Sequence, residues 1–325
     1  MYDLPTIPGH PEQWSITQEI YIDDAAIANR LALDAVERGA EAILFTVENR
    51  FDLETVFKNF PFSTSGLYID WKFLDEAFIS DTISYLKEKN ATVYHLIDVL
   101  GNLEHLISVS TSVYQNAGAN MVQQLAYGLA HANEYLNHFD PSKQNASPPI
   151  TFTVAVGSNY FFEIAKIRAL RMLFASLASA YNTPTTCHII ALPSRRNKTL
   201  YDYNVNMLRT TTECMAATLG GANSVCNLPY DALYHKSNEF GERIARNQLL
   251  ILKNESYFDA VSNPADGSYY IETLTHQLAE KALELFKSIE KGGGLLSQLK
   301  EGTLQKKIKE SAQKEQDWFD EGKIV

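Results

Sequence analysis

The sequence predicts an α/β protein, an eight-stranded (β/α)8 TIM barrel with extra C-terminal helices. Two observations support this fold class. Short strand-like runs alternate with helical patterns through most of the 325 residues, and only helical patterns follow the last run. Strands that alternate with helices predict βαβ crossovers and a parallel sheet, and eight such units predict a barrel.

Each predicted strand is a short apolar or alternating run between turn residues. The predicted strands comprise residues 15–20, 42–47, 65–70, 92–98, 106–110, 150–156, 186–192 and 223–228. The connection over residues 98–105 is too short for a crossover helix, so it is the weakest part of the strand count.

The predicted helices share apolar residues at spacings of three and four. They comprise residues 24–37, 53–59, 71–88, 112–136, 160–181, 200–218, 241–252, 271–289 and 302–319. We therefore expect a short N-terminal arm over residues 1–13, a barrel over 14–263 and C-terminal helices over 264–325 that lead to a linker. The run Gly292-Gly293-Gly294 follows a helix, which favours a C-cap and linker over a phosphate loop.

The helix over residues 200–218 lies at the centre of this organisation, between two predicted strands. One of its sides gathers apolar residues, and we expect this side to face the core. These residues are Leu200, Tyr203, Met207, Leu208, Thr211, Met215 and Leu219.

The predicted strands alternate between small or polar side chains and apolar ones. Because helices must cover the apolar side of a barrel, the small and polar side should face the barrel axis. These inward residues are Ser15, Thr17, Glu19, Ser108, Ser110, Thr151, Thr153, Ala155, Ser224 and Cys226. Small hydroxyl side chains would leave a polar cavity that admits an extended ligand. The alternative is an antiparallel sheet with one face in water.

Composition restricts the class of partner and the compartment. The formal net charge of −11 argues against a general nucleic-acid binder, since phosphate contacts need a basic field. No run of eighteen apolar residues predicts a membrane span, and the N-terminus lacks a signal-peptide pattern, so we expect a soluble cytoplasmic protein. Cys187, Cys214 and Cys226 have no CxxC spacing and are expected as buried reduced thiols.

Four blocks of the sequence resemble the acyl-CoA-binding barrel of the methylmalonyl-CoA mutase family, in the same order as in that family. The closest resemblance is to the small, non-catalytic subunit of heterodimeric bacterial enzymes. The blocks are NKTLYDYNVNMLRTTTECMAATLGG (197–221), GSNYFFEIAKIRALRMLFASL (157–177), ARNQLLIL (245–252) and DGSYYIETLTHQLAEKALELFKSIE (266–290).

The resemblance implies a role in the adenosylcobalamin-dependent interconversion of succinyl-CoA and methylmalonyl-CoA, with the pantetheine arm of coenzyme A threading the barrel. In the family, cobalamin is held through the His of a DxHxxG motif. No His of this sequence has an Asp two residues before it. We therefore expect no cofactor and no metal on this chain, a cobalamin-binding domain absent after residue 325, and adenosylcobalamin in a partner large subunit.

Two positions depart from the family's catalytic pattern. The family has a Tyr in a context like WTIRQYAGF and a His in a context like RTHSQTSGW. The first context, aligned on Trp14, places Glu19 at the family's Tyr and Thr17 at its Arg. The second context places Ile190 at the family's His. Since Ile cannot donate a hydrogen bond to a thioester carbonyl, both positions are expected to be degenerate.

Several polar residues remain candidates for binding an acyl-CoA. They are Thr17, Gln115, His188, Arg195, Arg196, Asn206 and Arg209. Structural roles are the simpler interpretation for Asn206 and Arg209, and a hydrogen-bonded core position is the simpler one for His188. Arg195, Arg196 and Lys198 form a basic loop after a strand that could meet phosphates or simply face solvent.

Two functions are consistent with these observations. In the first, the chain pairs with and stabilises a mutase large subunit. In the second, it is a free-standing barrel enzyme or acyl-CoA binder that uses Glu19, His188 and the Arg195/Arg196 loop. No second carboxylate accompanies Glu19 in the inward set, so we expect a structural role for Glu19.

Overall fold

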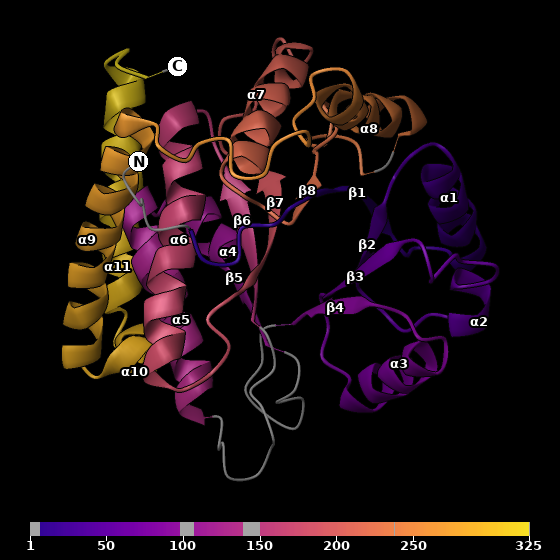
Figure 1. The fold of residues 1–325 in the computed structure, drawn as a ribbon, viewed down its shortest axis with the longest axis horizontal. Helices are drawn as coiled ribbons and strands as arrows, with labels where there is room; N and C mark the ends of the chain where they lie inside the picture. Colours follow the sequence, from indigo (N-terminus) through magenta and orange to yellow (C-terminus); the bar gives the residue numbers. More distant parts are fainter. Residues whose placement is uncertain (1–6, 98–106, 139–149, 237, 325) are drawn as a thin grey trace.

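Eight parallel strands surround a central axis in the computed structural model, which describes residues 7–97, 107–138, 150–236 and 238–324 (Figure 1). The predicted connection over 98–105 and the first six residues of the predicted arm lie outside the described residues. The strands are β1 (Ser15–Tyr21), β2 (Ala42–Val47), β3 (Gly66–Trp71), β4 (Val93–Leu96), β5 (Ser108–Ser110), β6 (Thr151–Val156), β7 (His188–Pro193) and β8 (Ser224–Cys226).

The sheet has the order β4-β3-β2-β1-β8-β7-β6-β5, and every ladder in it is parallel. Within the described ranges no ladder joins β4 to β5, although their Cα atoms approach to 8 Å or less. The sheet is thus a nearly closed barrel, and the predicted α/β (β/α)8 TIM barrel is confirmed.

Helices cover the outer face of the barrel. They are α1 (Ala25–Glu37), α2 (Leu53–Val56), α3 (Glu76–Glu88), α4 (Thr111–Asn116), α5 (Met121–His138), α6 (Tyr160–Ala180), α7 (Val205–Leu219) and α8 (Glu239–Asn254). Aspartates begin the first three, because the side chains of Asp24, Asp52 and Asp75 accept the N–H groups of residues three positions later. Each Asp therefore fixes where the chain turns from the strand end into its crossover helix.

Three further helices, α9 (Tyr269–Lys291), α10 (Gly294–Lys300) and α11 (Thr303–Asp320), lie outside α5 and α6 (Figure 1). Arg168 of α6 is fully buried and fixes the segment before α9, since its guanidinium donates to Asn263 at 2.7 Å, Asp266 at 3.0 Å and Glu272 at 2.5 Å. The C-terminal helices predicted from the sequence are present, and they extend the core of the barrel's α5–α6 side.

Three helix predictions need correction. The helix predicted over 112–136 is divided into α4 and α5, because Gly118 has φ +104° and no side chain to oppose this turn. The predicted linker after Gly292 is a tight turn at Gly293 and Gly294 that leads directly into α10. The helix predicted over 200–218 begins only at Val205.

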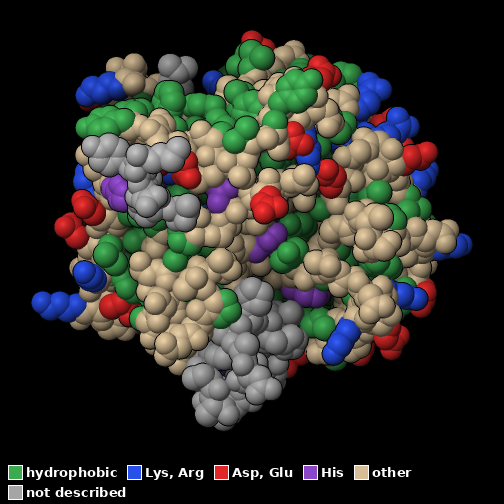
Figure 2. Space-filling view, viewed as in Figure 1, with side chains coloured by type: hydrophobic (Ala, Val, Ile, Leu, Met, Phe, Trp, Pro, Cys, Tyr) green, Lys and Arg blue, Asp and Glu red, His purple; other side chains and the backbone are tan. Residues whose placement is uncertain are grey.

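The predicted core face of α7 is only partly correct, since Met215 and Leu219 pack against the core but other predicted members do not. Leu200 is 59% exposed and Leu208 is 69% exposed. In Figure 2 hydrophobic side chains gather along the upper edge of the molecule, where α7 lies in Figure 1. The buried face is instead made of small and polar residues at helical spacing. They are Asn206, Thr210, Glu213, Cys214, Ala216, Ala217 and Thr218.

The core consists of two clusters between strands and helices and a third inside the barrel. The outward residues of β1, β5, β6, β7 and β8 pack with α5 to α8 in the first cluster, and those of β1, β2 and β3 pack with α1 to α3 in the second. The three cysteines are buried and unbonded to one another, as expected.

Candidate functional site

The inward assignment of the small and polar strand residues is confirmed by contacts across the barrel interior. Thr17 of β1 is hydrogen-bonded to Ser224 of β8. Glu19 accepts a 2.8 Å bond from the Thr46 hydroxyl of β2. Their neighbours Ile16, Val225 and Phe152 lie in the outer core cluster. The alternative of an antiparallel sheet facing water is excluded by the parallel ladders.

The interior is more filled than the sequence predicts, because β2, β3 and β4 contribute large side chains to it. Leu44, Tyr68, Leu96, Ile190 and Cys226 form a cluster in which no member is more than 7% exposed. The predicted cavity was based on the strands that have small inward residues. The roomy interior expected from those strands is therefore closed by this central layer, which has Ile190 as its fully buried member from β7.

His188 occupies the interior beside this layer and makes the hydrogen bond expected of a core histidine. Its Nε2 lies 2.8 Å from the Tyr68 hydroxyl, and its ring stacks on Tyr94 with centroids 3.9 Å apart. Burial, with a smaller contribution from the Arg171 charge, lowers the pKa of His188 to about 4. The ring is therefore neutral near pH 7.

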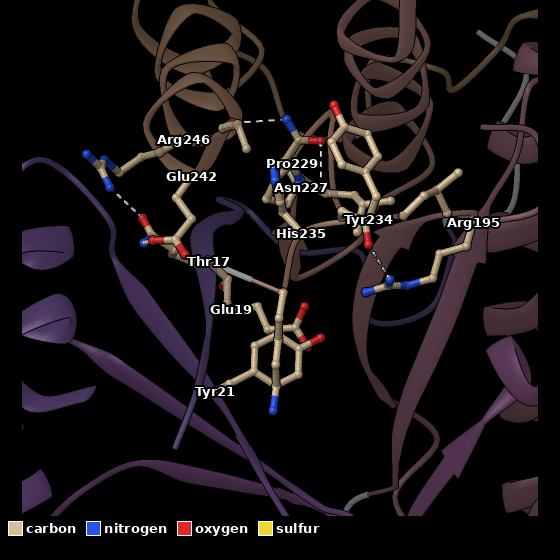
Figure 3. A pocket seen from close by; sticks show the side chains of 16 residues that line it. Thr17, Glu19, Tyr21, Arg195, Asn227, Pro229, Tyr234, His235, Glu242 and Arg246 are labelled. Carbon is tan, nitrogen blue, oxygen red and sulfur yellow. Dashed lines mark hydrogen bonds between the residues drawn. The ribbon is translucent and has the colours of Figure 1, made fainter. Parts of the chain in front are cut away.

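A cavity of about 380 Å³ opens at the carboxyl ends of β1, β7 and β8, where sites of this fold form (Figure 3). Thr17, Glu19 and Tyr21 line it from β1, Arg195 lines it from the loop after β7, and Arg246 lines it from α8. The segment from Asn227 to Lys236 provides much of the remaining lining. The structure thus brings together Thr17, Glu19 and Arg195 of the predicted site residues.

Glu19 is the central acid of this cavity, and burial raises its pKa above the usual range, while the Thr46 hydrogen bond opposes the shift. Asp70 of β3 also raises the pKa of Glu19 by charge repulsion, and burial raises the pKa of Asp70 itself. The expectation that no second carboxylate joins Glu19 is therefore wrong. The missed signal was the inward parity of Asp70, which follows Tyr68 by two residues at the end of its strand.

Tyr21 and Arg195 complete the polar side of the cavity. Burial, and then the Glu19 charge, raise the pKa of Tyr21 to about 12, so its phenol stays protonated. The Arg195 guanidinium donates to the Ala232 carbonyl at 3.2 Å and counteracts the shifts of both Glu19 and Tyr21. Figure 3 shows Arg195 and Arg246 on opposite sides of the cavity, with Glu19 and Tyr21 below them.

The residues of the predicted basic loop have three different environments. Arg195 reaches the cavity, but Arg196 pairs with Glu315 of α11 at 2.5 Å. Lys198 is buried and pairs with Glu213 of α7 at 2.7 Å. The loop is therefore not a single phosphate-binding cluster, because tertiary carboxylates neutralise two of its three cations.

Gln115, Asn206 and Arg209 lie outside the cavity lining and support the loops around it. Gln115 donates to the Ser194 hydroxyl at 2.6 Å. Asn206 donates to the carbonyls of Thr199 and Tyr230, each at 2.9 Å, and Arg209 donates to the Asn197 carbonyl. The structural interpretation of Asn206 and Arg209 agrees with these contacts.

The described residues contain no group of three or more His, Cys, Asp or Glu side chains placed to hold a metal ion. Among the helices that the structure describes, none has the length and apolar character needed to cross a membrane.

Comparisons with known proteins identify the family. Residues 87–325 match the family model described as methylmalonyl-CoA mutase. The chain is 33% identical to the methylmalonyl-CoA mutase small subunit of Porphyromonas gingivalis over 92% of this chain and 56% of that protein. It is 36% identical to the small subunit of Streptomyces virginiae over 62% of this chain and 34% of that protein. It is also 37% identical to the methylmalonyl-CoA mutase of Cereibacter sphaeroides over 67% of this chain and 32% of that protein.

The chain spans about half the length of the Porphyromonas gingivalis relative and about a third of the other two. The resemblance seen in the four sequence blocks agrees with the family match, which covers most of the barrel and all the C-terminal helices. The chain belongs to the methylmalonyl-CoA mutase family.

Proposed function

We propose that this chain is the non-catalytic barrel of a small subunit, which pairs with and stabilises a catalytic large subunit of a methylmalonyl-CoA mutase. One observation carries the proposal. Glu19 and Ile190 stand at the two positions where the family pattern has its Tyr and His, and both are held by the surrounding fold in ways that suit no acyl-CoA chemistry.

Ile190 offers no polar group to a thioester. Its side chain is fully buried against Leu44, Tyr68 and Leu96 in the central layer of the barrel. The electrostatic stabilisation of a developing oxyanion requires a hydrogen-bond donor at a fixed place, and a branched alkyl group supplies none. The same layer narrows the path that a pantetheine arm would need along the axis, which supports a role without turnover.

Glu19 likewise interacts with neighbouring residues of the barrel. It accepts from Thr46 and is adjacent to the charges of Asp70 and Arg195. The rival function needs Glu19, His188 and the arginine loop to act together. His188 does not line the cavity of Glu19, and Arg196 turns to Glu315, so the geometry favours the subunit role.

Adenosylcobalamin would belong to the large subunit. In this sequence no histidine lies in a DxHxxG motif, and the described residues offer no set of metal-ligating side chains. These residues therefore do not fit the group, and no step of the reaction is assigned to them. A cytoplasmic location is part of the same proposal, because three buried cysteines without a disulfide suit a reducing compartment.

The test is a set of mutase assays with purified chains and adenosylcobalamin. We expect no conversion of methylmalonyl-CoA by this chain alone, and greater thermal stability or activity of a cognate large subunit when the chain is added. Sedimentation should show a complex in the mixture. Turnover by the chain alone, or absence of association with the large subunit, would contradict the proposal. Heat of binding with an acyl-CoA added to the isolated chain would favour the rival function.

A further inference from the structure

The cavity at the carboxyl ends of β1, β7 and β8 has an unbalanced supply of hydrogen-bond donors. The Ala232 contact of Arg195 uses one of the five N–H groups of its guanidinium. The Nε of Arg246 is buried and has no hydrogen-bond partner among the described residues. Arg246 is otherwise held by Gln18 through its Nη1. Because the Nε of Arg246 is out of reach of solvent, Arg195 is the cation of the lining whose remaining N–H groups a ligand could meet.

The charged residues that line the cavity are the acids Glu19 and Glu242 and the bases Arg195, Lys236 and Arg246. Lys236 lines the cavity too, but its ammonium is paired with Asp23 at 2.7 Å. Glu242 lies near Gln18, whose amide donates to it at 3.3 Å. Glu19 is the acid on the floor of the cavity, and its pKa is raised by burial and by the nearby Asp70 charge, while Arg195 opposes the shift.

Part of the cavity lining is apolar. Leu228, Pro229, Ala232 and Leu233 line it from the loop after β8, and Ala245 lines it from α8. A volume of about 380 Å³ lies at the lower end of the range for small-molecule sites, so a nucleotide would be too large. The lining is suited to a ligand with one charged end and a short apolar part.

From these contacts we propose that the cavity binds a short-chain carboxylic acid. Arg195 holds the carboxylate, Glu19 and Tyr21 lie against its oxygens, and the loop from Leu228 to Leu233 covers the hydrocarbon end. A planar guanidinium matches a carboxylate in two parallel hydrogen bonds. The Tyr21 phenol can donate to a ligand oxygen, whereas a doubly charged phosphate beside Glu19 would be disfavoured.

Isothermal titration of the chain with straight-chain acids from acetate to hexanoate tests the proposal. We expect saturable binding that strengthens about fourfold for each methylene until the apolar side is filled. Inorganic phosphate and butylamine serve as the anionic and cationic comparison ligands. Tighter binding of either one than of every carboxylic acid would overturn the assignment of ligand class.

Two matched variants locate the site. Arg195→Met should weaken binding of butyrate at least tenfold, because it removes a charge-assisted pair. Arg196→Met, the neighbouring arginine that turns to Glu315, should leave the affinity within twofold. Equal affinities of both variants and the wild type, or no saturable binding by the wild type up to about 10 mM, well above the usual range for small-molecule sites, would overturn the proposal.

Two further variants separate the polar and apolar ends. Glu19→Gln keeps the shape of the side chain and should preserve or strengthen binding, since it removes negative charge beside the carboxylate. A tenfold loss in Glu19→Gln would contradict the placement of the carboxylate. Leu233→Gln should abolish the gain in affinity with chain length. The inference does not depend on pairing with a large subunit, so a chain that associates but binds no acid overturns only this inference.

Discussion

Replacing Lys198 by Met should destabilise the protein by about 3 to 5 kcal/mol near pH 7, the usual effect of removing one partner of a buried ion pair. The two side chains are 1% and 0% exposed, and the Lys198 Nζ lies 2.7 and 2.9 Å from the two carboxylate oxygens of Glu213. Without Lys198 the carboxylate would keep only the 2.5 Å bond from Asn197. Urea unfolding with an unchanged m-value measures the loss.

The sign of the pH dependence follows from Glu213. Burial already raises its pKa, and the loss of Lys198 removes the main opposing charge. The folded variant would then bind a proton more strongly than the unfolded chain. Its deficit relative to wild type should therefore be largest above the folded pKa of Glu213 and shrink as the pH falls through that pKa.

Two controls make this prediction specific. Lys58→Met replaces an exposed lysine and should change the free energy of unfolding by no more than about 0.5 kcal/mol. The double variant Lys198→Met with Glu213→Leu should be more stable than Lys198→Met alone, because it leaves no buried charge without a partner. A loss below about 1 kcal/mol in Lys198→Met near pH 7 would refute the reasoning.

Three other predictions follow from the interior and the C-terminal helices. The His188 ring should titrate by NMR near pH 4. Because its folded pKa is lowered, the free energy of unfolding should fall by at most about 3 kcal/mol as the pH drops from 6.5 towards 4. A titration midpoint above pH 6 would contradict the buried placement of the ring. Thr153→Leu, on the inward side of β6, should be tolerated with a loss of roughly 1 to 3 kcal/mol in chemical denaturation, and a larger loss would mean that the interior has no space beside it. Gly118→Ala should lower the melting temperature more than Gly302→Ala does. Both glycines have positive φ, but a Cβ at Gly118 would lie 2.4 Å from the Ala312 Cβ of α11, whereas a Cβ at Gly302 would meet nothing within 4 Å. Equal shifts in melting temperature would show that α11 moves freely at Gly118.

The sequence was a reliable guide wherever the signal is local. Alternation along β1 and β6 placed Thr17 and Thr153 on the inward side, because a strand with one face against helices has only one choice of parity. Strand runs and the change from strand to helix spacing predicted the eight units and the fold class. The family resemblance predicts that Glu19 and Ile190 replace the family's Tyr and His, and that prediction uses only the local context of two strands.

The sequence-based prediction failed where the buried side chains are polar. The buried face of α7 carries Asn206, Thr210 and Glu213, while its leucine Leu208 faces outward. Hydrophobic periodicity assumes that apolar residues seek the core. Here the polar residues are satisfied by distant partners, with Lys198 on Glu213 and the Tyr230 carbonyl on Asn206. No local pattern reports such partners, so the polar half of the buried face was not predicted.

The sequence by itself determined the class of fold and the parity of the strands, because each depends on residues near one another in the chain. Only the tertiary structure decided that Tyr68 and Leu96 close the centre of the barrel, and that Arg195 alone of its loop reaches the cavity of Glu19. The filling of the barrel interior and the pairing of charges depend on which side chains come into contact in the folded protein. These contacts join strands that are far apart in the sequence, and their geometry is fixed only when the barrel closes.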